Sequence, residues 1–451
     1  MYLRLVVLLA LFSFSFAALA QSFGPEELIS DLTPNGNNIQ VADLDGDSDL
    51  DVIVALNTFS NSRVVWFKND GQGNFDSAQT AFSGINRPYS LAVGDIDGDQ
   101  DLDLLTGSSI SDELVWFAND GSGNFGSKKT ITRGQRSIQF VYLTDIDQDM
   151  DLDVMASSIL DRKIALYINQ GQGQFSSENR IDSVFPHQPR FIATADIDGD
   201  NDLDVIATTI RSGTHRIYSY ENHGNLTFAN KTEIYSGKEI TVLHAEDLDA
   251  DGDPDIVFAD AQEKSLVWLI NDGNGSFGSK QLLHGNAGEY VRGLTIADVD
   301  GDGDLDLLSA SANEGLIAWY EQQNAMAFHQ HVIHQSGQGA NGIQYGDLNG
   351  DGKNDVVVSW WEDRKATWYP QVEPALFLEE LSTINSPIFP NPTRNTLRVQ
   401  PDQLGQPYQV IGLSGQVLME GTLESQLDVS SLQPGTYGLV INGKYFPWVK
   451  E

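Results

Sequence analysis

Apolar and polar positions follow one order that repeats along most of the chain. In one unit, the short apolar segment Ser90–Gly94 precedes a nine-residue acidic loop, and the apolar run Leu102–Thr106 follows it. The aromatic segment Val115–Phe117, a turn rich in Gly and Asn, and the polar segment Phe125–Thr132 complete the unit. Apolar runs of five or six residues are too short for buried helices, so we expect four β-strands per unit.

The acidic loops recur at intervals of 49 to 52 residues, and they begin at Asp43, Asp95, Asp145, Asp196, Asp247, Asp298 and Asp347. A constant period of this size indicates a repeat protein, and four short strands per unit are typical of a propeller blade. The predicted fold class is therefore all-β, with a seven-bladed β-propeller. Beyond residue 373 the period stops, and short strands separated by Gly turns predict a small C-terminal Ig-like β-sandwich.

The two ends of the repeat region are predicted to share one blade. The segment Phe23–Ser30 is similar to the fourth segment Phe277–His284, whereas the last unit, Asp347–Tyr369, contains only three segments. Pairing the two ends closes the ring and removes its open sheet edges. A strand that begins at Phe377 is the alternative, because Phe377 follows Trp368 at the spacing found in the other units.

The N-terminus has the features of a secretory signal peptide. Arg4 precedes the apolar run Leu5–Phe16, and Ala18-Leu-Ala20 provides a small-residue cleavage site before Gln21. An uncleaved membrane anchor is the alternative. No later stretch has 18 consecutive apolar residues, so no membrane span is expected after signal cleavage. The predicted organisation is a signal peptide at 1–20, the propeller at 21–372, a linker at 373–386 and a C-terminal domain at 387–451.

The charge of the chain is strongly acidic, with 64 acidic residues, 26 basic residues and a formal charge of −38. Of these acids, 33 lie in the seven loops. Such a field repels nucleic acid and anionic lipid, so neither is an expected partner. The chain has no cysteine, which excludes disulfides and a thiol nucleophile. Bound cations could take the place of disulfides as cross-links.

Each acidic loop is predicted to bind Ca²⁺, because carboxylates at alternate positions repel one another and a cation relieves that repulsion. Oxygen ligands on a tight Gly-containing loop suit this ion better than zinc or copper. The expected ligands are the side chains at loop positions 1, 3, 5 and 9 and the backbone carbonyl at position 7, where the last loop has Lys353. A solvated acidic turn without a metal is the alternative.

The predicted side-chain ligands are, loop by loop, Asp43, Asp45, Asp47 and Asp51; Asp95, Asp97, Asp99 and Asp103; Asp145, Asp147, Asp149 and Asp153; Asp196, Asp198, Asp200 and Asp204; Asp247, Asp249, Asp251 and Asp255; Asp298, Asp300, Asp302 and Asp306; and Asp347, Asn349, Asp351 and Asp355. This gives up to seven ions, one per blade. The third loop is expected to bind its ion most weakly, because Gln148 and Met150 replace the Gly that a tight loop favours.

The acidic loops and the turns after the third segments resemble a known repeat. The loop Asp347–Asp355 and the Asn-Asp-Gly-x-Gly-x-Phe segments at Asn69, Asn119 and Asn271 resemble the FG-GAP/VCBS repeat, as in the propeller of integrin alpha subunits. The resemblance covers residues 23 to 370. It implies a seven-bladed propeller whose calcium loops join adjacent strands of a blade, and a role in adhesion or ligand recognition.

The C-terminal segment resembles the type A sorting domain of the type IX secretion system in Bacteroidota. The motifs are Phe389–Thr393, Val410–Gln416, Leu432–Tyr437 and Val449–Lys450. The resemblance implies the secretion machinery as a partner, and export across the outer membrane of a Gram-negative bacterium to its surface or the medium. An ordinary accessory β-sandwich is the alternative.

The expected function is a calcium-stabilised adhesion module that recognises an extracellular glycan or protein. No catalytic residue is assigned, since no Ser-His-Asp signature or HExxH motif occurs and the histidines are scattered. A polysaccharide-degrading lyase or hydrolase on a propeller scaffold is the alternative. Tryptophans at one place on the third strand favour packing between blades: Trp66, Trp116, Trp268, Trp319 and Trp368. Trp360 and Trp361 are adjacent, so one of them should be exposed.

Overall fold

The computed structural model describes residues 22–372, except 32, 34, 59–61, 184–186 and 325–326, and C-terminal residues 388–389, 395–399, 404–411, 417–433, 435–441 and 444–450. The chain divides into two compact units, Met1–Val372 and Glu373–Glu451. The predicted signal peptide and linker lie outside the described residues. In the described part of the chain, no helix is long and apolar enough to cross a membrane.

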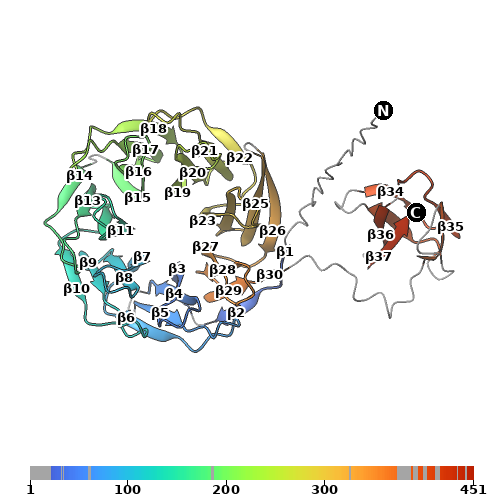
Figure 1. Cartoon of the computed structure of the whole chain (residues 1–451), viewed down its shortest axis with the longest axis horizontal. Coiled ribbons are helices and arrows are strands. Elements are labelled where there is room, and N and C mark those ends of the chain that lie inside the picture. The colour runs from blue at the N-terminus through green and yellow to red at the C-terminus, as the bar shows by residue number, and fades with distance from the viewer. Residues whose placement is uncertain are drawn as a thin grey trace, which may run out of the picture. The chain divides into compact units, whose positions relative to one another are not determined.

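Seven four-stranded antiparallel sheets surround a common centre in the first unit (Figure 1). Six of them take four consecutive strands in chain order: β3 (Gly36–Ala42), β4 (Asp51–Leu56), β5 (Arg63–Phe67) and β6 (Gln79–Ser83); β7 (Pro88–Gly94), β8 (Asp103–Ser108), β9 (Glu113–Phe117) and β10 (Lys129–Arg133); β11 (Ile138–Thr144), β12 (Asp153–Ser158), β13 (Lys163–Tyr167) and β14 (Asn179–Ser183); β15 (Gln188–Ala195), β16 (Asp204–Arg211), β17 (Thr214–Tyr220) and β18 (Thr232–Gly237); β19 (Ile240–Glu246), β20 (Asp255–Asp260), β21 (Ser265–Leu269) and β22 (Gln281–His284); β23 (Val291–Ala297), β24 (Asp306–Ser311), β25 (Leu316–Asn324) and β26 (Ala327–Gln335).

The seventh sheet joins the two ends of this unit. It has the order β2 (Glu27–Ser30), β29 (Lys365–Tyr369), β28 (Asp355–Trp360) and β27 (Ala340–Gly346). Next to it, β1 (Ser22–Phe23) pairs with β30 (Gln371–Val372), so that Phe23 faces Gln371. The same pairing of an amide residue with a Phe recurs in other sheets as an isolated bridge, for example between Asn271 and Phe277. The alternative strand at Phe377 lies outside the described residues.

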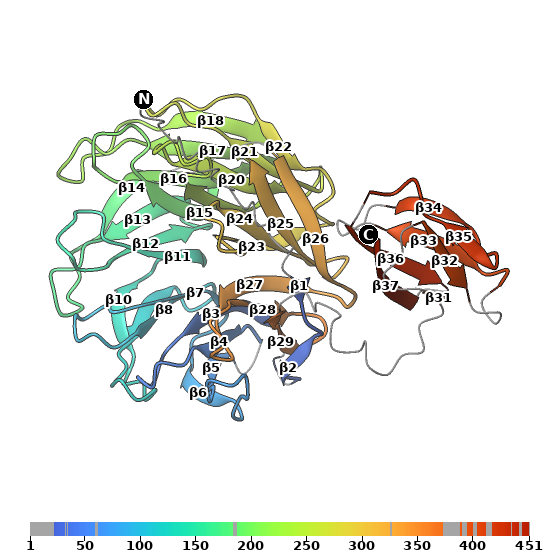
Figure 2. The same ribbon diagram turned by 45° about the vertical axis from the view of Figure 1, so that its right-hand side comes forward.

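The first strand of every sheet lies nearest the centre, and neighbouring first strands pack side by side until β27 meets β3 (Figures 1 and 2). The apolar core lies between adjacent sheets. Ile53 and Trp66 of one sheet, for example, pack with Leu104 and Val115 of the next. Each sheet is thus buried on both faces, which explains the continuous apolar runs in the second strands.

The repeated tryptophans are buried and pack between sheets, as predicted. Trp66 lies against the turn of the next sheet, where a Cβ atom added to Gly123 would be 2.4 Å from the indole ring. Trp116 packs in the same way against Gly173. Trp360, the last residue of β28, is fully buried, whereas Trp361 directly after it is 38% exposed, so one of the pair is exposed as expected.

The fourth strand was predicted to begin at its Phe, and this is wrong. In the second sheet it begins at Lys129, and Phe125 makes only an isolated bridge to Asn119. The reason is a closed turn, because the Gly126 N–H donates to the Ala118 carbonyl at 2.8 Å. The turn uses the backbone groups that a longer strand would need.

The second unit contains two antiparallel sheets. One has the order β31 (Ile388–Phe389), β32 (Thr396–Val399) and β35 (Gln426–Asp428), and the other has β34 (Val417–Thr422), β33 (Pro407–Ile411), β36 (Gly435–Ile441) and β37 (Lys444–Lys450). Leu397, Leu427, Val410 and Leu439 from the two sheets share one buried cluster. The short strands expected in this region are therefore present.

Candidate functional site

Each acidic loop joins the first strand of a sheet to the second, and its first Asp organises the turn. Asp298 accepts hydrogen bonds from the backbone N–H groups of Gly301 (2.7 Å) and Gly303 (3.1 Å). Residues at positions 4 and 6 have positive φ in all seven loops. A tight loop was expected to favour Gly, and the structure shows this conformation at both positions whether or not the residue is Gly.

The third loop has a side chain at both of these positions. Gln148 has φ of 61° and Met150 has φ of 76°, a region that costs a residue with a Cβ atom about 1–2 kcal/mol. Met150 is also 92% exposed. Within the described residues, Gln148 does not donate its N–H to Asp145, whereas the glycine at the same position does in five other loops.

The Asp at position 9 is buried in every loop. Asp306 accepts hydrogen bonds from the backbone N–H groups of Val299 (3.1 Å) and Gln322 (2.7 Å), and so ties its loop to the end of the third strand. Burial raises the pKa of Asp306 to about 7. The equivalent pKa values are about 7 for Asp51, Asp153 and Asp204 and about 6 for Asp103, Asp255 and Asp355, in each case chiefly because of burial.

The loops bring together carboxylates that could hold a metal ion. The described residues contain six groups of acids whose ligand atoms lie within 4.8 Å of one another, and five of them are Asp43, Asp45 and Asp51; Asp95, Asp97 and Asp99; Asp145, Asp147 and Asp153; Asp196, Asp198 and Asp204; and Asp247, Asp249 and Asp251. Positions 1 and 3 belong to all five groups, and either position 5 or position 9 completes each. The acid at position 7 lies elsewhere, since Asp49 packs against Gly71 of the turn that follows the third strand.

Position 3 supplies the observation that favours an ion. One carboxylate oxygen of Asp45, Asp97 and Asp249 is buried and has no hydrogen-bond partner in the described part of the chain. A buried charged oxygen without a partner is costly. A cation held by positions 1 and 3 together with position 5 or position 9 would give these oxygens a partner, so the residues present fit a hard metal ion.

The ring of loops is not uniform in charge. The Lys68 ammonium forms an ion pair with Asp45 and lies 2.9 Å from Asp47 Oδ2 in the first loop. In the second loop, Lys129 Nζ lies 3.2 Å from Asp97 Oδ2. At the residue equivalent to Lys68, the sheet of the sixth loop has Glu321. The pKa of Asp300 is raised chiefly by burial, then by the charge of the neighbouring Asp302, and to a smaller extent by the charge of Glu321.

A set of amide side chains links six of the seven loops to the next sheet, and this contact was not predicted. The Asn119 Nδ2 group donates to the carbonyl of Leu44 in the preceding loop (2.7 Å) and to that of Leu102 in its own loop (3.2 Å). Six such amides reach the preceding loop: Asn69, Asn119, Asn169, Asn271, Gln322 and Gln371. Their place three residues after the third-strand tryptophan was the available signal.

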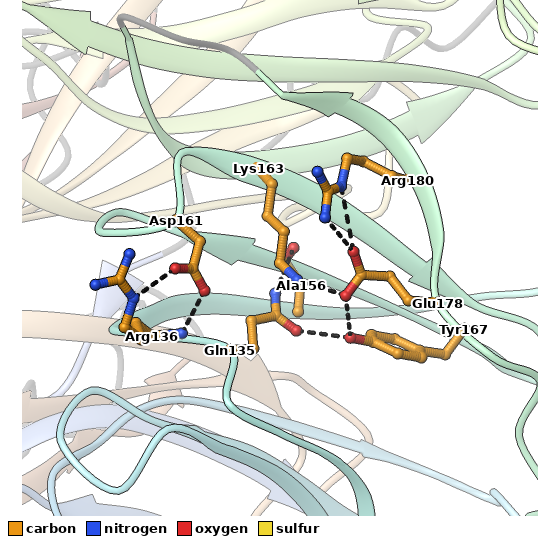
Figure 3. Close-up of polar contacts among 8 residues, drawn as sticks. All are labelled: Gln135, Arg136, Ala156, Asp161, Lys163, Tyr167, Glu178 and Arg180. Carbon is orange, nitrogen blue, oxygen red and sulfur yellow. Dashed lines mark hydrogen bonds and ion pairs between the residues drawn. The ribbon is translucent and has the colours of Figure 1, made fainter.

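A partly buried charged network outside the loops lies on the third sheet (Figure 3). Glu178 on the edge forms an ion pair with Lys163 and accepts hydrogen bonds from Arg180 (3.1 Å) and Tyr167 (3.4 Å). Tyr167 also lies within hydrogen-bonding distance of Gln135 Oε1 (2.9 Å). Burial raises the pKa of Glu178, but Lys163 and Arg180 outweigh it and the net shift is downward. Both carboxylate oxygens of Glu178 are engaged, so this network links β13 to β14. We call Lys163, Tyr167, Glu178 and Arg180 the clasp.

Acidification is expected to stabilise the metal-free protein between pH 7.5 and 5.5. The position-9 carboxyls have folded-state pKa values of about 6 to 7 against 3.8 for an ordinary Asp, so the folded state binds more protons in this window. Their stabilising contribution is complete below the unfolded pKa and is lost as the pH rises through the folded pKa. The measurement is the melting temperature of chelated and dialysed protein at both pH values. A steady fall on acidification across this window would contradict the expectation.

Comparisons with known proteins agree with this architecture. The FG-GAP-like repeat family matches at residues 43–106, 145–207, 196–258, 247–309 and 298–358, and these five matches include all seven acidic loops. The family of secretion system C-terminal sorting domains matches residues 387–450. No curated protein sequence matches the chain.

Solved structures share the fold at low sequence identity. A lectin from Agrocybe aegerita, described by its specific recognition of non-reducing terminal N-acetylglucosamine, is 17% identical with a TM-score of 0.51, over 75% of this chain and 86% of that one. The BP39L lectin from Burkholderia pseudomallei is 11% identical with a TM-score of 0.54, over 75% and 96%. BBS1N in complex with ARL6DN is 11% identical with a TM-score of 0.55, over 79% and 98%.

The loops, the four-stranded sheets and the matched regions lead to one assignment. The chain belongs to the FG-GAP-like repeat family, has a β-propeller fold and ends in a type IX secretion system sorting domain.

Proposed function

We propose that this protein is a secreted or cell-surface binding module, a calcium-stabilised propeller that recognises an extracellular glycan or protein. The observation that carries the proposal is the combination, in one chain, of a propeller shared with two lectins and a sorting domain for export. In this proposal each four-stranded sheet is one blade of a seven-bladed ring, and the C-terminal unit is an Ig-like sandwich. Export to the surface or the medium of a Bacteroidota-like bacterium follows from the sorting domain.

Calcium is the proposed ion in up to seven loops. Positions 1, 3, 5 and 9 would supply side-chain oxygens, and position 7 a backbone carbonyl. The ion would neutralise the loops and hold the first strand of each sheet to the second. Oxygen-only ligands favour this ion, and the unpartnered carboxylate oxygens at position 3 support a bound cation.

Met150→Gly is expected to tighten calcium binding in the third loop, proposed as the weakest. The substitution removes a side chain from a backbone with positive φ and leaves every proposed ligand in place. The gain should be about fivefold in affinity, since relief of about 1 kcal/mol of strain changes a binding constant by about that factor. Calorimetric titration of the variant checks it, and Gln172→Gly, another positive-φ site outside the loops, serves as the control. A Met150→Gly affinity equal to wild type would contradict the strain argument.

Lys68→Met is expected to increase calcium affinity in the first loop. The Lys68 ammonium sits on the carboxylates of positions 3 and 5, and a calcium ion must displace it there. Titration should reveal a tighter site or an additional one. The matched control is Lys128→Met, since Lys128 is equally exposed but pairs with Glu113 away from the loops. Identical titrations for both variants would show that Lys68 does not compete with the ion.

The binding function itself is tested with arrays of glycans and extracellular proteins, probed with the full chain with and without calcium. Reproducible binding of at least one ligand class is expected. Release of reducing sugar or of unsaturated product from a polysaccharide panel would favour the alternative, a lyase or hydrolase. No binding on the arrays and no product from the polysaccharide panel would indicate a purely structural role and contradict the proposal.

A further inference from the structure

A cavity of about 370 Å³ lies at the centre of the ring of first strands, and all seven of these strands line it. Its volume falls in the range of small-ligand sites. Tyr89, Arg292 and Asn341 on its wall are each the second residue of their strand. The acidic loops follow the other ends of the same strands. The polar end of the cavity therefore lies on the face opposite the proposed calcium sites.

One register position of the first strand, six residues before each acidic loop, supplies much of the wall. In six strands these residues are Tyr89, Gln139, Arg190, Thr241, Arg292 and Asn341. Two residues further along, the same strands have only apolar residues: Leu91, Val141, Ile192, Leu243, Leu294 and Ile343. The repeats thus have the same residue type at the position that packs between sheets and different residue types at the axial position, six residues before each loop. The axial position therefore distinguishes the sheets from one another.

Two arginines occupy this axial position in a protein with a large excess of acids. Within the described residues, neither Arg190 nor Arg292 forms an ion pair, and the buried Arg190 Nε has no hydrogen-bond partner. Arg292 Nη1 donates to Asn341 Oδ1 at 3.3 Å. Its guanidinium carbon lies 5.1 Å from the Tyr290 ring and 5.4 Å from the Trp361 ring. These rings hold the guanidinium in position without neutralising its charge.

The other titratable groups leave the arginine end positively charged. Glu239 lines the cavity at this end, directly before β19, and accepts a hydrogen bond from the Tyr290 hydroxyl (2.6 Å). Burial, and then the charge of Arg190, lower the pKa of His215, and burial lowers that of His244, so both are neutral near pH 7. Glu246, the last residue of its strand, lies at the far end. Two guanidinium groups therefore face one carboxylate.

Aromatic and uncharged polar groups surround the arginines. Tyr89 lines the cavity and is 36% exposed, so it offers an aromatic ring to a ligand. Gln139 and Thr241 lie on the same register position. Sugars combine an apolar ring face with many hydroxyls, and both features have partners here. A guanidinium fork matches a planar carboxylate with two parallel hydrogen bonds.

We propose that this axial cavity binds an anionic sugar of an acidic glycan, with Arg190 and Arg292 on its acidic group and Glu239 and Asn341 on its hydroxyls. This inference rests on the proposed binding function and names its ligand class. An anion can bind here although the protein is acidic, because the acidic loops lie at the opposite ends of the strands from the two arginines.

The test is calorimetric titration of the calcium-loaded full chain with a galacturonic acid trisaccharide, its methyl ester, a neutral galactose trisaccharide and a sulfated galactan oligomer. We expect the oligouronide to bind, and the methyl ester and the neutral sugar to bind at least about tenfold more weakly. Stronger binding of the sulfated oligomer would support the same site with sulfate as its anion. Equal binding of acid, ester and neutral sugar would overturn the inference.

The variants Arg190→Met and Arg292→Met are expected to lose at least about tenfold in affinity for the acidic sugar. Arg292→Lys, which keeps the charge but not the fork, should be intermediate. Arg136→Met is the matched control. Arg136 precedes the first strand of the third sheet, at the end that corresponds to Arg190 and Arg292 in their own sheets, but it pairs with Asp161 and does not line the cavity (Figure 3). Melting curves verify folding. If both arginine variants bind an array ligand as wild type does, the binding function stands and the axial site is refuted; if wild type binds nothing, the binding function falls first.

Discussion

Removal of calcium is expected to lower the melting temperature of the protein by about 10 °C or more, because each ion bound at 100 times its Kd adds about 2.7 kcal/mol to the free energy of unfolding. Without the ion, each loop retains a set of like charges that includes buried carboxylates, such as Asp51 and Asp306. The measurement is thermal melting in EGTA and in millimolar calcium.

Two controls make this result specific. Calcium added back after EGTA should restore the melting temperature, and magnesium at the same concentration should restore less, since it prefers a rigid octahedral site with retained waters. The double variant Asp298→Asn and Asp300→Asn should respond less to EGTA, because it removes two ligands from a loop with glycine at both positive-φ positions. A melting temperature that EGTA does not change would contradict calcium binding in all loops together.

Deletion of residues 21–30 is expected to abolish cooperative unfolding of the propeller or to cause aggregation. The deletion removes β2, the fourth strand of the sheet that joins the chain ends, and leaves β29 as an open edge. It also uncovers the core against which Ile29 packs. Thermal melting and size-exclusion chromatography of the truncated chain measure the effect.

A pair of substitutions separates strand docking from simple shortening. Ile29 is 9% exposed and its neighbour Leu28 is 57% exposed. Ile29→Ala should cost about 2–4 kcal/mol of unfolding free energy, whereas Leu28→Ala should stay within about 0.5 kcal/mol. Equal effects of the two substitutions would show that β2 does not close the ring as the structure describes.

The clasp on the third sheet bears on the enzymatic alternative. Glu178 is a partly buried carboxylate that a glycosidase could use, but its oxygens are engaged by Lys163, Arg180 and Tyr167. A retaining glycosidase needs a second carboxyl about 5 Å away, and the other carboxylate in this close-up, Asp161, is itself paired with Arg136 (Figure 3). This cluster therefore gives the alternative no support.

Some features could be read from residues that are close in sequence. The loop Asp298–Asp306 displays its alternating carboxylates within nine residues, and its repetition marks the start of each second strand. The buried Trp66 and Trp116 and the exposed Trp361 also followed from position along a strand. Local turn chemistry was harder, and the fourth strands began later than expected because the Asn119–Gly126 segment closes on itself.

Other features depend on residues from different sheets. Lys68 meets Asp45 across 23 positions, and Asn119 meets Leu44 across 75; no local pattern identifies the partner in either contact. Arg190 and Arg292 are unremarkable in the sequence, and only the closed ring places both on one axis.

The sequence by itself determined the repeat, the all-β class and the oxygen-rich loops, because those depend on the order of apolar and polar residues within one unit of about 50 residues. The tertiary structure decided the rest: which strand closes the ring, which loops have a lysine beside their carboxylates, and which side chains face the central cavity. Those outcomes depend on how seven similar sheets pack around a centre, and packing brings together residues whose positions in the chain are unrelated by any period.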